Sequence, residues 1–484
     1  MNHHENTRRD FLRTVGAGAA ALTMPMCATA AKPPKKRPNI LFLFSDDQRF
    51  DTINALGNSR IITPNMDSLV RDGTTFLNAY IMGSMSGAVC MPSRAMLMSG
   101  RTLFRLSGDG GGIPPGHVTL PEVLRNAGYR TFATGKWHND RRAYTRCFSD
   151  GGKIFFGGMS DHYKVPVYDF NPEGKYPKSK QYVDEGKHSS ELFSDAAIKF
   201  LRGYKDDAPF FAYVSYTAPH DPRHMPKEYM DMYDARAIPL PKNFLPEHPF
   251  NNGEMVIRDE KLAAWPRTPD EVRENIAAYY AMITHLDAQI GRVLDALRET
   301  GHADDTIVVF SADNGLAVGR HGLMGKQNLY EHSVHVPLIM CGPGIPENKR
   351  QEALCYLLDI YPTLCDLVGL KVPDSVEGIS LGPVLRGERE KTRDALFFAY
   401  KNFQRGLRIG GWKLILYNVN GRKTTQLFHI WHDPWEMNNL ADELAYAGTV
   451  RDLIPLMKHF CEEAGDRVDL DKPDWGVAAA APGA

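Results

Sequence analysis

Four short apolar runs, each followed at once by polar residues, most constrain the fold of this chain. They cover residues 39–45, 130–134, 209–215 and 306–311. Helical patterns near 189–202 and 270–300 lie between them. An unbroken apolar run of this length is typical of a strand that is covered on both faces. The alternation of strands with helices therefore predicts an α/β fold with a largely parallel sheet.

Weaker signals extend this prediction. A fifth strand is expected over 337–341, and short helices are expected after Thr63-Pro64 and over 119–128, because proline suits the first helical position. From about Arg386 the apolar runs become shorter, and a final helix is expected over 444–463. We therefore predict a large α/β domain over 31–385, a small antiparallel subdomain over 386–465 and a loose tail over 466–484.

The first 30 residues contain an export pattern. Arg8-Arg9 precede a weakly apolar stretch over 14–27 and a triplet of small residues over 28–30. This order resembles a twin-arginine signal peptide, which predicts a periplasmic or extracellular protein. The apolar part is shorter than the ~20 residues that span a bilayer, so no transmembrane anchor is expected. Lipidation of Cys27 is the alternative, which Pro25 in front of it fits poorly.

Charge and cysteine content exclude other classes. The chain has 57 Lys and Arg against 58 Asp and Glu. A protein that binds a phosphate backbone has a basic excess, so nucleic acid is not expected as a partner. The 7 cysteines show no CxxC pair and no zinc-like spacing. Most of them are therefore predicted to be small buried hydrophobes.

The polar residues after the apolar runs form a candidate site, because ligands of α/β sheets bind beyond the carboxyl ends of the strands. They are Asp46, Asp47, Lys136, His138, His220, Asp313 and Asn314. Three carboxylates and an amide oxygen favour Ca²⁺ or Mg²⁺ over zinc. The cationic members, joined by Lys326, would face an anion on that metal. This set predicts a site for a phosphate or sulfate ester.

One segment discriminates between these esters. Cys90-Met91-Pro92-Ser93-Arg94, followed by Gly100-Arg101, resembles the signature of type I sulfatases of the alkaline phosphatase-like superfamily. In that family a maturation enzyme oxidises the cysteine to Cα-formylglycine. The resemblance runs from about Pro38 to Leu440. It implies a large mixed, mainly parallel sheet sandwiched by helices, with a small C-terminal antiparallel sheet.

The resemblance also implies the roles of individual residues. The Ca²⁺ ligands would be Asp46, Asp47, Asp313, Asn314 and the modified Cys90. The residues that bind sulfate and transfer protons would be Arg94, Lys136, His138, His220 and Lys326. One hydroxyl of hydrated formylglycine would attack sulfur, and His220 or Lys326 would protonate the leaving alcohol. His138 would then help to deprotonate the second hydroxyl, which expels sulfate.

The expected substrate is a sulfated carbohydrate, because an exported sulfatase more often resembles polysaccharide sulfatases. An insert over 140–187 carries arginines and tyrosines that would line a sugar subsite or belong to a solvated loop. Two alternatives remain open. One is a phosphodiesterase or phosphonate hydrolase of the same superfamily. The other is a catalytically silent protein that binds sulfated glycans and in which Cys90 stays unmodified.

Overall fold

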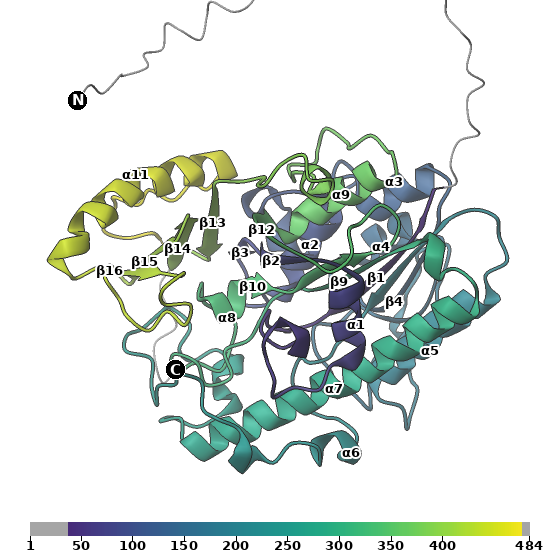
Figure 1. Cartoon of the computed structure of the whole chain (residues 1–484), viewed down its shortest axis with the longest axis horizontal. Helices are drawn as coiled ribbons and strands as arrows, with labels where there is room; N and C mark the ends of the chain where they lie inside the picture. The colour runs from purple at the N-terminus through teal and green to yellow at the C-terminus, as the bar shows by residue number, and fades with distance from the viewer. Residues whose placement is uncertain (1–36, 477–484) are drawn as a thin grey trace, which may run out of the picture. The chain divides into compact units, whose positions relative to one another are not determined.

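The computed structural model describes residues 37–476, which lie in one compact unit beginning at Arg37. The predicted export signal, with Cys27, lies outside the described residues. Figure 1 shows a central sheet with helices packed on it and a second, smaller sheet beneath helix α11. Among residues 37–476, no helix combines the length and the apolar character needed to cross a membrane.

The central sheet has the order β10-β2-β11-β9-β1-β8-β4-β5, and β12 pairs with β2. Its parallel part is β9 (Thr306–Ala312), β1 (Asn39–Ser45), β8 (Phe210–Ser215), β4 (Arg130–Lys136) and β5 (Asp150–Phe155). The other strands are β2 (Gly73–Tyr80), β10 (His335–Val336), β11 (Leu338–Cys341) and β12 (Lys349–Tyr356). The four apolar runs are therefore strands, as predicted. The fifth, β11, runs antiparallel to β9 and β2.

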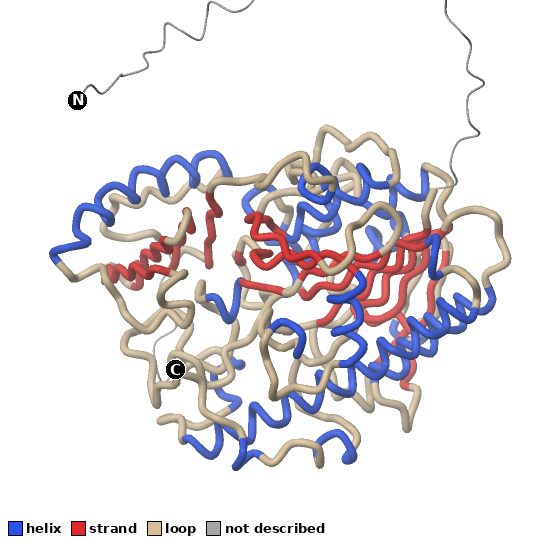
Figure 2. The backbone as a smooth tube through the Cα atoms, viewed as in Figure 1, coloured by secondary structure: helices blue, strands red, loops and turns tan. Residues whose placement is uncertain are grey.

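Helices cover both faces of this sheet, because β1 is apolar on both sides (Figure 2). Phe42 and Phe44 pack in one core, with α2 (Cys90–Ser99), α3 (Leu120–Asn126), α4 (Arg141–Cys147) and α9 (Ile360–Leu367). Leu41 and Leu43 pack in the other, with α1 (Pro64–Asp72), α5 (Ser189–Gly203) and α7 (Pro269–Glu299). This confirms the predicted fold class.

Local signals set several helix ends. Thr119 and Glu122 form a reciprocal capping box at the start of α3, and the Thr268 side chain caps α7. Both helices carry proline in their first turn. The predicted helices at these positions are confirmed. Short helices α6 (Lys227–Met230), α8 (Glu331–Val334) and α10 (Gly382–Leu385) lie in the connections.

The second sheet has the order β16-β15-β14-β13-β3. Its antiparallel strands are β13 (Ala395–Tyr400), β14 (Gln404–Ile409), β15 (Trp412–Val419) and β16 (Arg422–His429), and α11 (Ala447–Ala464) follows them. The fifth strand, β3 (Gly83–Ser84), comes from the segment just before α2 and pairs parallel to β13. A further small ribbon pairs β6 (Pro166–Val167) with β7 (Tyr182–Val183).

The C-terminal segment is packed, contrary to the expectation of a loose tail from 466. Asp466 forms an ion pair with the fully buried Arg405. Leu470 and Trp475 are buried as well. This expectation rested on the Ala and Gly residues at the very end of the chain, and residues 477–484 lie outside the described ones. Asp466 thus anchors the start of this segment, because it is the partner of a buried arginine.

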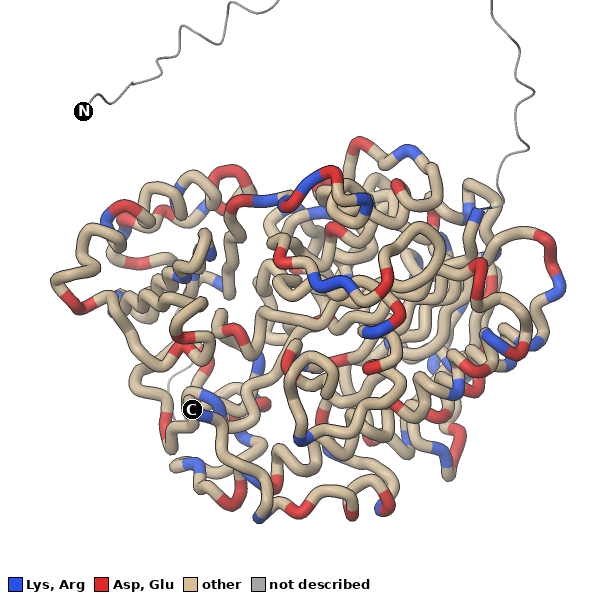
Figure 3. The backbone as a smooth tube through the Cα atoms, in the orientation of Figure 1, with Lys and Arg blue, Asp and Glu red and all other residues tan. Residues whose placement is uncertain are grey.

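The aromatic residues of the 140–187 insert mostly belong to the core. Tyr144, Tyr168 and Tyr176 are buried, and the Arg141 guanidinium stacks over Tyr168 at 5.2 Å. These side chains support the loop itself and do not line a sugar subsite. Along the backbone, Figure 3 shows acidic and basic residues interspersed over the visible elements, in line with the near-neutral charge.

Candidate active site

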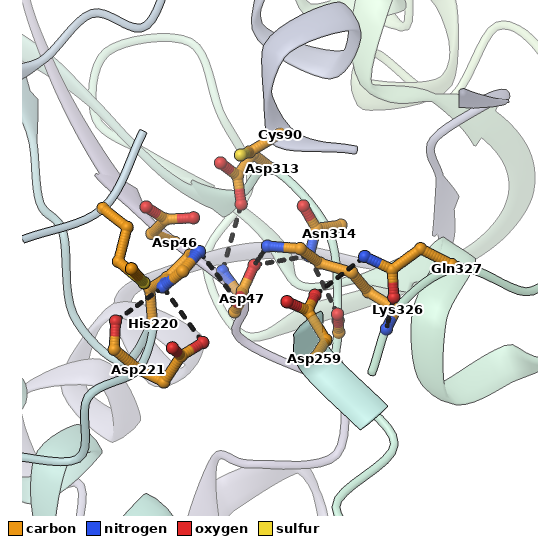
Figure 4. Close-up of polar contacts among 12 residues, drawn as sticks. Asp46, Asp47, Cys90, His220, Asp221, Asp259, Asp313, Asn314, Lys326 and Gln327 are labelled. Atoms are coloured by element: carbon orange, nitrogen blue, oxygen red, sulfur yellow. Dashed lines mark hydrogen bonds and ion pairs between the residues drawn. The ribbon is translucent and has the colours of Figure 1, made fainter. Parts of the chain in front are cut away.

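The parallel strands bring the predicted residues together at one edge of the sheet (Figure 4). Ser45 at the end of β1 pairs with Ala312 at the end of β9, so Asp46 and Asp313 follow adjacent strands. Lys136 ends β4, on the far side of β8. Helix α2 begins at Cys90 and places Arg94 one turn further on. Asp47 and Asn314, which are 267 residues apart in the chain, therefore meet because β1 and β9 are adjacent strands.

The three carboxylates and the amide form a buried oxygen cluster. The Asp47 backbone N–H donates to Asp313 Oδ1 at 3.0 Å, and Asn314 Nδ2 donates to Asp47 Oδ1 at 2.7 Å. Three other oxygens of the cluster are buried without a hydrogen-bond partner: Asp46 Oδ1, Asp47 Oδ2 and Asn314 Oδ1. Unpaired buried oxygens are rare in proteins. The donor set therefore fits a hard divalent cation such as Ca²⁺.

Three buried cations lie against these carboxylates. Arg94 donates from Nε to Asp313 Oδ2 at 2.9 Å. Lys136 Nζ lies 2.5 Å from Asp46 Oδ2, and Lys326 Nζ lies 2.5 Å from Asp47 Oδ1. Three positive charges thus balance three negative ones. A divalent cation added to this cluster would leave a surplus of positive charge, which attracts an anionic ester.

Cys90 lies between a base and a cation. Its Sγ is 3.2 Å from His138 Nδ1 and 3.4 Å from Lys136 Nζ. Burial raises the pKa of the Cys90 thiol, although Lys136 and Lys326 oppose the shift. Burial, with the nearby charges of Lys136 and Arg94, lowers the pKa of His138 far below its ordinary value. His138 is therefore a neutral imidazole in this structure.

His220 points its two ring nitrogens at different partners. Nδ1 lies 2.8 Å from the Asp221 carbonyl oxygen, and Nε2 lies 3.7 Å from Asp47 Oδ2. Burial lowers the pKa of His220, against the effect of Asp47. Burial opposes ionisation of Asp47 too, but His220 and Lys326 outweigh it and the pKa of Asp47 is lowered. In contrast, burial and the neighbouring Asp313 raise the pKa of Asp46 well above its ordinary range.

The backbone is strained at two of these residues. Asp47 and His138 both have φ of 64°, a left-handed conformation that non-glycine residues seldom adopt. Asp47 lies two residues after the end of β1, and His138 lies two residues after the end of β4. At these points the chain bends sharply and directs the side chain into the site. Strain of this kind is concentrated at functional sites.

The residues open into a pocket of about 260 Å³, lined by Cys90, His138, His220 and Lys326. Its remaining wall was missed by sequence reasoning and consists of Gly87, Ala88, Gly158, Met159, Ile257, Arg258, Asp259 and Gln327. Most of these residues lie on loops that carry no recognisable motif. Gln327 could have been suspected, because it follows the predicted site residue Lys326 directly in the sequence. A larger cavity of about 680 Å³ beside β5 and α5 contains none of the predicted site residues.

All ten predicted residues therefore meet in one place, although their roles stay predictions. Comparison with known proteins supports the class of enzyme. Residues 38–370 match the family model of sulfatases, and residues 319–463 match the model of the N-sulphoglucosamine sulphohydrolase C-terminal region. The chain belongs to the sulfatase family. It is therefore a sulfuric ester hydrolase with an alkaline phosphatase-like fold.

Individual relatives are similar over most of their length. The chain is 27% identical to an N-acetylglucosamine-6-O-sulfatase of Bacteroides thetaiotaomicron, over 91% of this chain and 89% of that one. It is 29% identical to an ulvan-active sulfatase of Formosa agariphila, over 89% of this chain and 82% of that one. A structure solved with its substrate D-glucosamine-2-N,6-O-disulfate has a TM-score of 0.76 and 25% identity, covering 89% of this chain and 99% of that one.

A fourth neighbour shares the fold alone. The phosphonate monoester hydrolase of Agrobacterium radiobacter has a TM-score of 0.70 and 23% identity, covering 88% of this sulfatase and 96% of that chain.

Proposed function

We propose that this sulfatase hydrolyses sulfate esters of sugars, with Cys90 converted to formylglycine and one Ca²⁺ held by Asp46, Asp47, Asp313 and Asn314. One observation carries the proposal. Cys90 lies at the floor of the pocket, between His138 and Lys136, and beside a carboxylate cluster with unpaired oxygens. No other described cysteine lines this pocket.

Ca²⁺ and the formylglycine derived from Cys90 would each supply part of the chemistry. Ca²⁺ would neutralise charge on the ester and on the nucleophile. Formylglycine at position 90 would supply, as its hydrate, a hydroxyl that attacks sulfur and a second one that permits release of sulfate. Residue 90 would join the four oxygen ligands as the fifth, since its side chain lies close enough to Asp46 and Asp313 for the three to hold one ion.

The chain's own residues hold the reactants and move the protons. His138 Nδ1, 3.2 Å from Sγ of residue 90, would accept a proton there. Lys136, 3.4 Å from the same atom, would stabilise negative charge on the nucleophile. Arg94 holds Asp313 in place through a hydrogen bond from Nε at 2.9 Å and an ion-pair contact from Nη2 at 2.8 Å. Arg94 is itself buried, so it would act mainly through that carboxylate.

Two side chains, His220 and Lys326, are the candidates for the group that donates a proton to the leaving alcohol. His220 and Lys326 both line the pocket. Burial opposes the charged form of Lys326, but Asp47 outweighs it and the pKa of Lys326 is raised well above its ordinary value. Lys326 therefore stays protonated and would also attract the sulfate. Both side chains line the same pocket as residue 90, and variants at the two positions would separate their roles.

Sugars are the proposed substrate class because relatives over most of the chain include an N-acetylglucosamine-6-O-sulfatase and an ulvan-active sulfatase. Arg258, Asp259 and Gln327 also bring polar groups to the wall of the pocket, which suits an alcohol rich in hydroxyls. Export to the periplasm or beyond remains part of this proposal and rests on the arginine pair of the first 30 residues.

The test combines the mass of the peptide that contains residue 90 with multiple-turnover kinetics on glucosamine 6-sulfate, 4-nitrophenyl sulfate and 4-nitrophenyl phosphate. We expect an aldehyde at position 90, and turnover of sulfates above that of the phosphate. Cys90→Ala should lose turnover, and Cys90→Ser should at most sulfate itself once and stall. An unmodified thiol in fully active enzyme would overturn the mechanism. A preference for phosphate would favour the phosphoesterase, and an absent aldehyde with sugar binding but no turnover would favour the silent relative.

A further inference from the structure

Polar residues joined by hydrogen bonds form the part of the pocket wall next to Lys326. Arg258 and Asp259 open a short 3-10 helix (Arg258–Leu262), and the Arg258 Nε donates to Asp259 Oδ1 at 2.9 Å. Asp259 Oδ2 accepts from Gln327 Nε2 at 2.7 Å. Gln327 also donates to the Gly87 carbonyl oxygen at 2.9 Å. Figure 4 shows Asp259 and Gln327 beside Lys326, so this wall adjoins the catalytic site.

This wall has unused hydrogen-bond acceptors on Asp259 and unused donors on Arg258, and a hydroxyl group can bond to both. A carboxylate has about four acceptor positions, and within residues 37–476 the hydrogen bonds to Asp259 oxygens come from Arg258 and Gln327. Arg258 has five N–H groups and a side chain that is 42% exposed. A sugar hydroxyl can donate to the carboxylate and accept from the guanidinium. The ring of an aryl ester can do neither.

The charge of the wall disfavours a second anion. Arg258 lies in ion-pair contact with both Asp221 and Asp259, so one guanidinium faces two carboxylates. Asp221 is buried, and its ionised form is held by Arg258 and by His220 Nδ1 at 3.3 Å. With all three side chains ionised, this group carries a net charge of −1, although Arg258 is its exposed member. A second sulfate placed against Asp259 itself would meet a carboxylate of like charge.

The pocket is also small. Its volume of about 260 Å³ lies below the roughly 300–1,000 Å³ of sites for drug-sized ligands. Met159, from the loop after β5, contacts the Arg258 guanidinium at the rim. A space of this size suits one sugar ring with its sulfate.

We infer that Asp259, supported by Arg258 and Gln327, binds a ring hydroxyl of a single sulfated sugar and sets a preference for monosulfated sugars over aryl sulfates and disulfated sugars. This inference rests on the proposed function, whose substrate it specifies. Asp259 is thus a specificity-determining residue of the same pocket.

The test measures kcat/KM for glucosamine 6-sulfate, glucosamine 2-N,6-O-disulfate and 4-nitrophenyl sulfate in the matured enzyme and in Asp259→Asn. The variant keeps the side-chain shape and removes the charge. We expect its loss on the monosulfated sugar to exceed its loss on the aryl sulfate at least tenfold, because a hydrogen bond to a charged group is removed. The preference for monosulfate over disulfate should shrink as well. Asp295→Asn, which removes a carboxylate from an exposed position on α7, is the matched control.

Equal losses on sugar and aryl substrates would overturn the inference, because they would show that Asp259 only supports the loop. An unchanged kcat/KM for glucosamine 6-sulfate in Asp259→Asn would also overturn the inference. Wild-type enzyme that hydrolyses the aryl sulfate and neither sugar would overturn this inference and leave sulfate ester hydrolysis in place. Failure of matured wild-type enzyme on every sulfate ester would instead refute the proposed function, and this inference with it.

Discussion

Gly158 is predicted to control the position of the base beside residue 90. A Cβ built on Gly158 would lie 2.5 Å from His138 Nε2 and 2.8 Å from Cε1. Gly158 does not have a left-handed φ, so alanine can adopt its backbone conformation. The effect of Gly158→Ala should therefore be steric, and it should fall on the His138 ring.

The size of the effect follows from these distances. Non-bonded atoms prefer about 3.5–4.0 Å, so the ring must move by roughly 1 Å. His138 Nδ1 is 3.2 Å from Sγ of residue 90, and a shift of this size removes that contact. A misplacement of about 1 Å costs on the order of 100-fold in rate, or about 2.7 kcal/mol. We expect kcat to fall by about that factor, with little change in the unfolding temperature.

The assay is steady-state hydrolysis of 4-nitrophenyl sulfate by matured enzyme, with the aldehyde at residue 90 quantified by mass so that incomplete maturation is not mistaken for lost catalysis. Gly152→Ala is the control, because its Cβ would meet Ala196 at an ordinary 4.0 Å. Wild-type kcat in a fully matured Gly158→Ala enzyme would refute the assignment of His138 as the base. A loss shared equally by Gly152→Ala would refute the steric argument.

Three further predictions concern the metal, the C-terminal segment and export. Asp313→Asn should lower bound calcium, measured by elemental analysis, and turnover together, because the remaining carboxylates offset the ion's dehydration poorly; full metal content would contradict the ligand assignment. Asp466→Ala should destabilise the protein by about 3–5 kcal/mol in urea unfolding, because it strands the fully buried Arg405 without its partner, whereas a neutral result would show that the pair contributes nothing. Changing Arg8 and Arg9 to lysine should retain the precursor inside the cell, and unchanged export in a fractionation assay would exclude twin-arginine routing.

The sequence by itself determined the strands and the chemistry at their ends. Unbroken apolar runs required strands buried on both faces, and the polar residues after them could only lie at the carboxyl edge of the sheet. Asp46, Lys136 and Asp313 were found in this way. Cys90 was found differently, through the motif around it. These signals are local in the chain, so they can be read without knowledge of the fold.

Only the tertiary structure decided which residues complete the pocket. Strand order placed β1 between β9 and β8, and the polarity of β11 could not be inferred from its own apolar run. Gly158 and Asp259 come from loops about 100 positions apart, and each depends on a side chain elsewhere in the chain, His138 for one and Gln327 for the other. The tyrosines of the insert were ambiguous in sequence because an aromatic ring suits a core as well as a sugar site. Whether a side chain is buried depends on which distant segments pack against it, so only the tertiary structure could show that these tyrosines belong to the core.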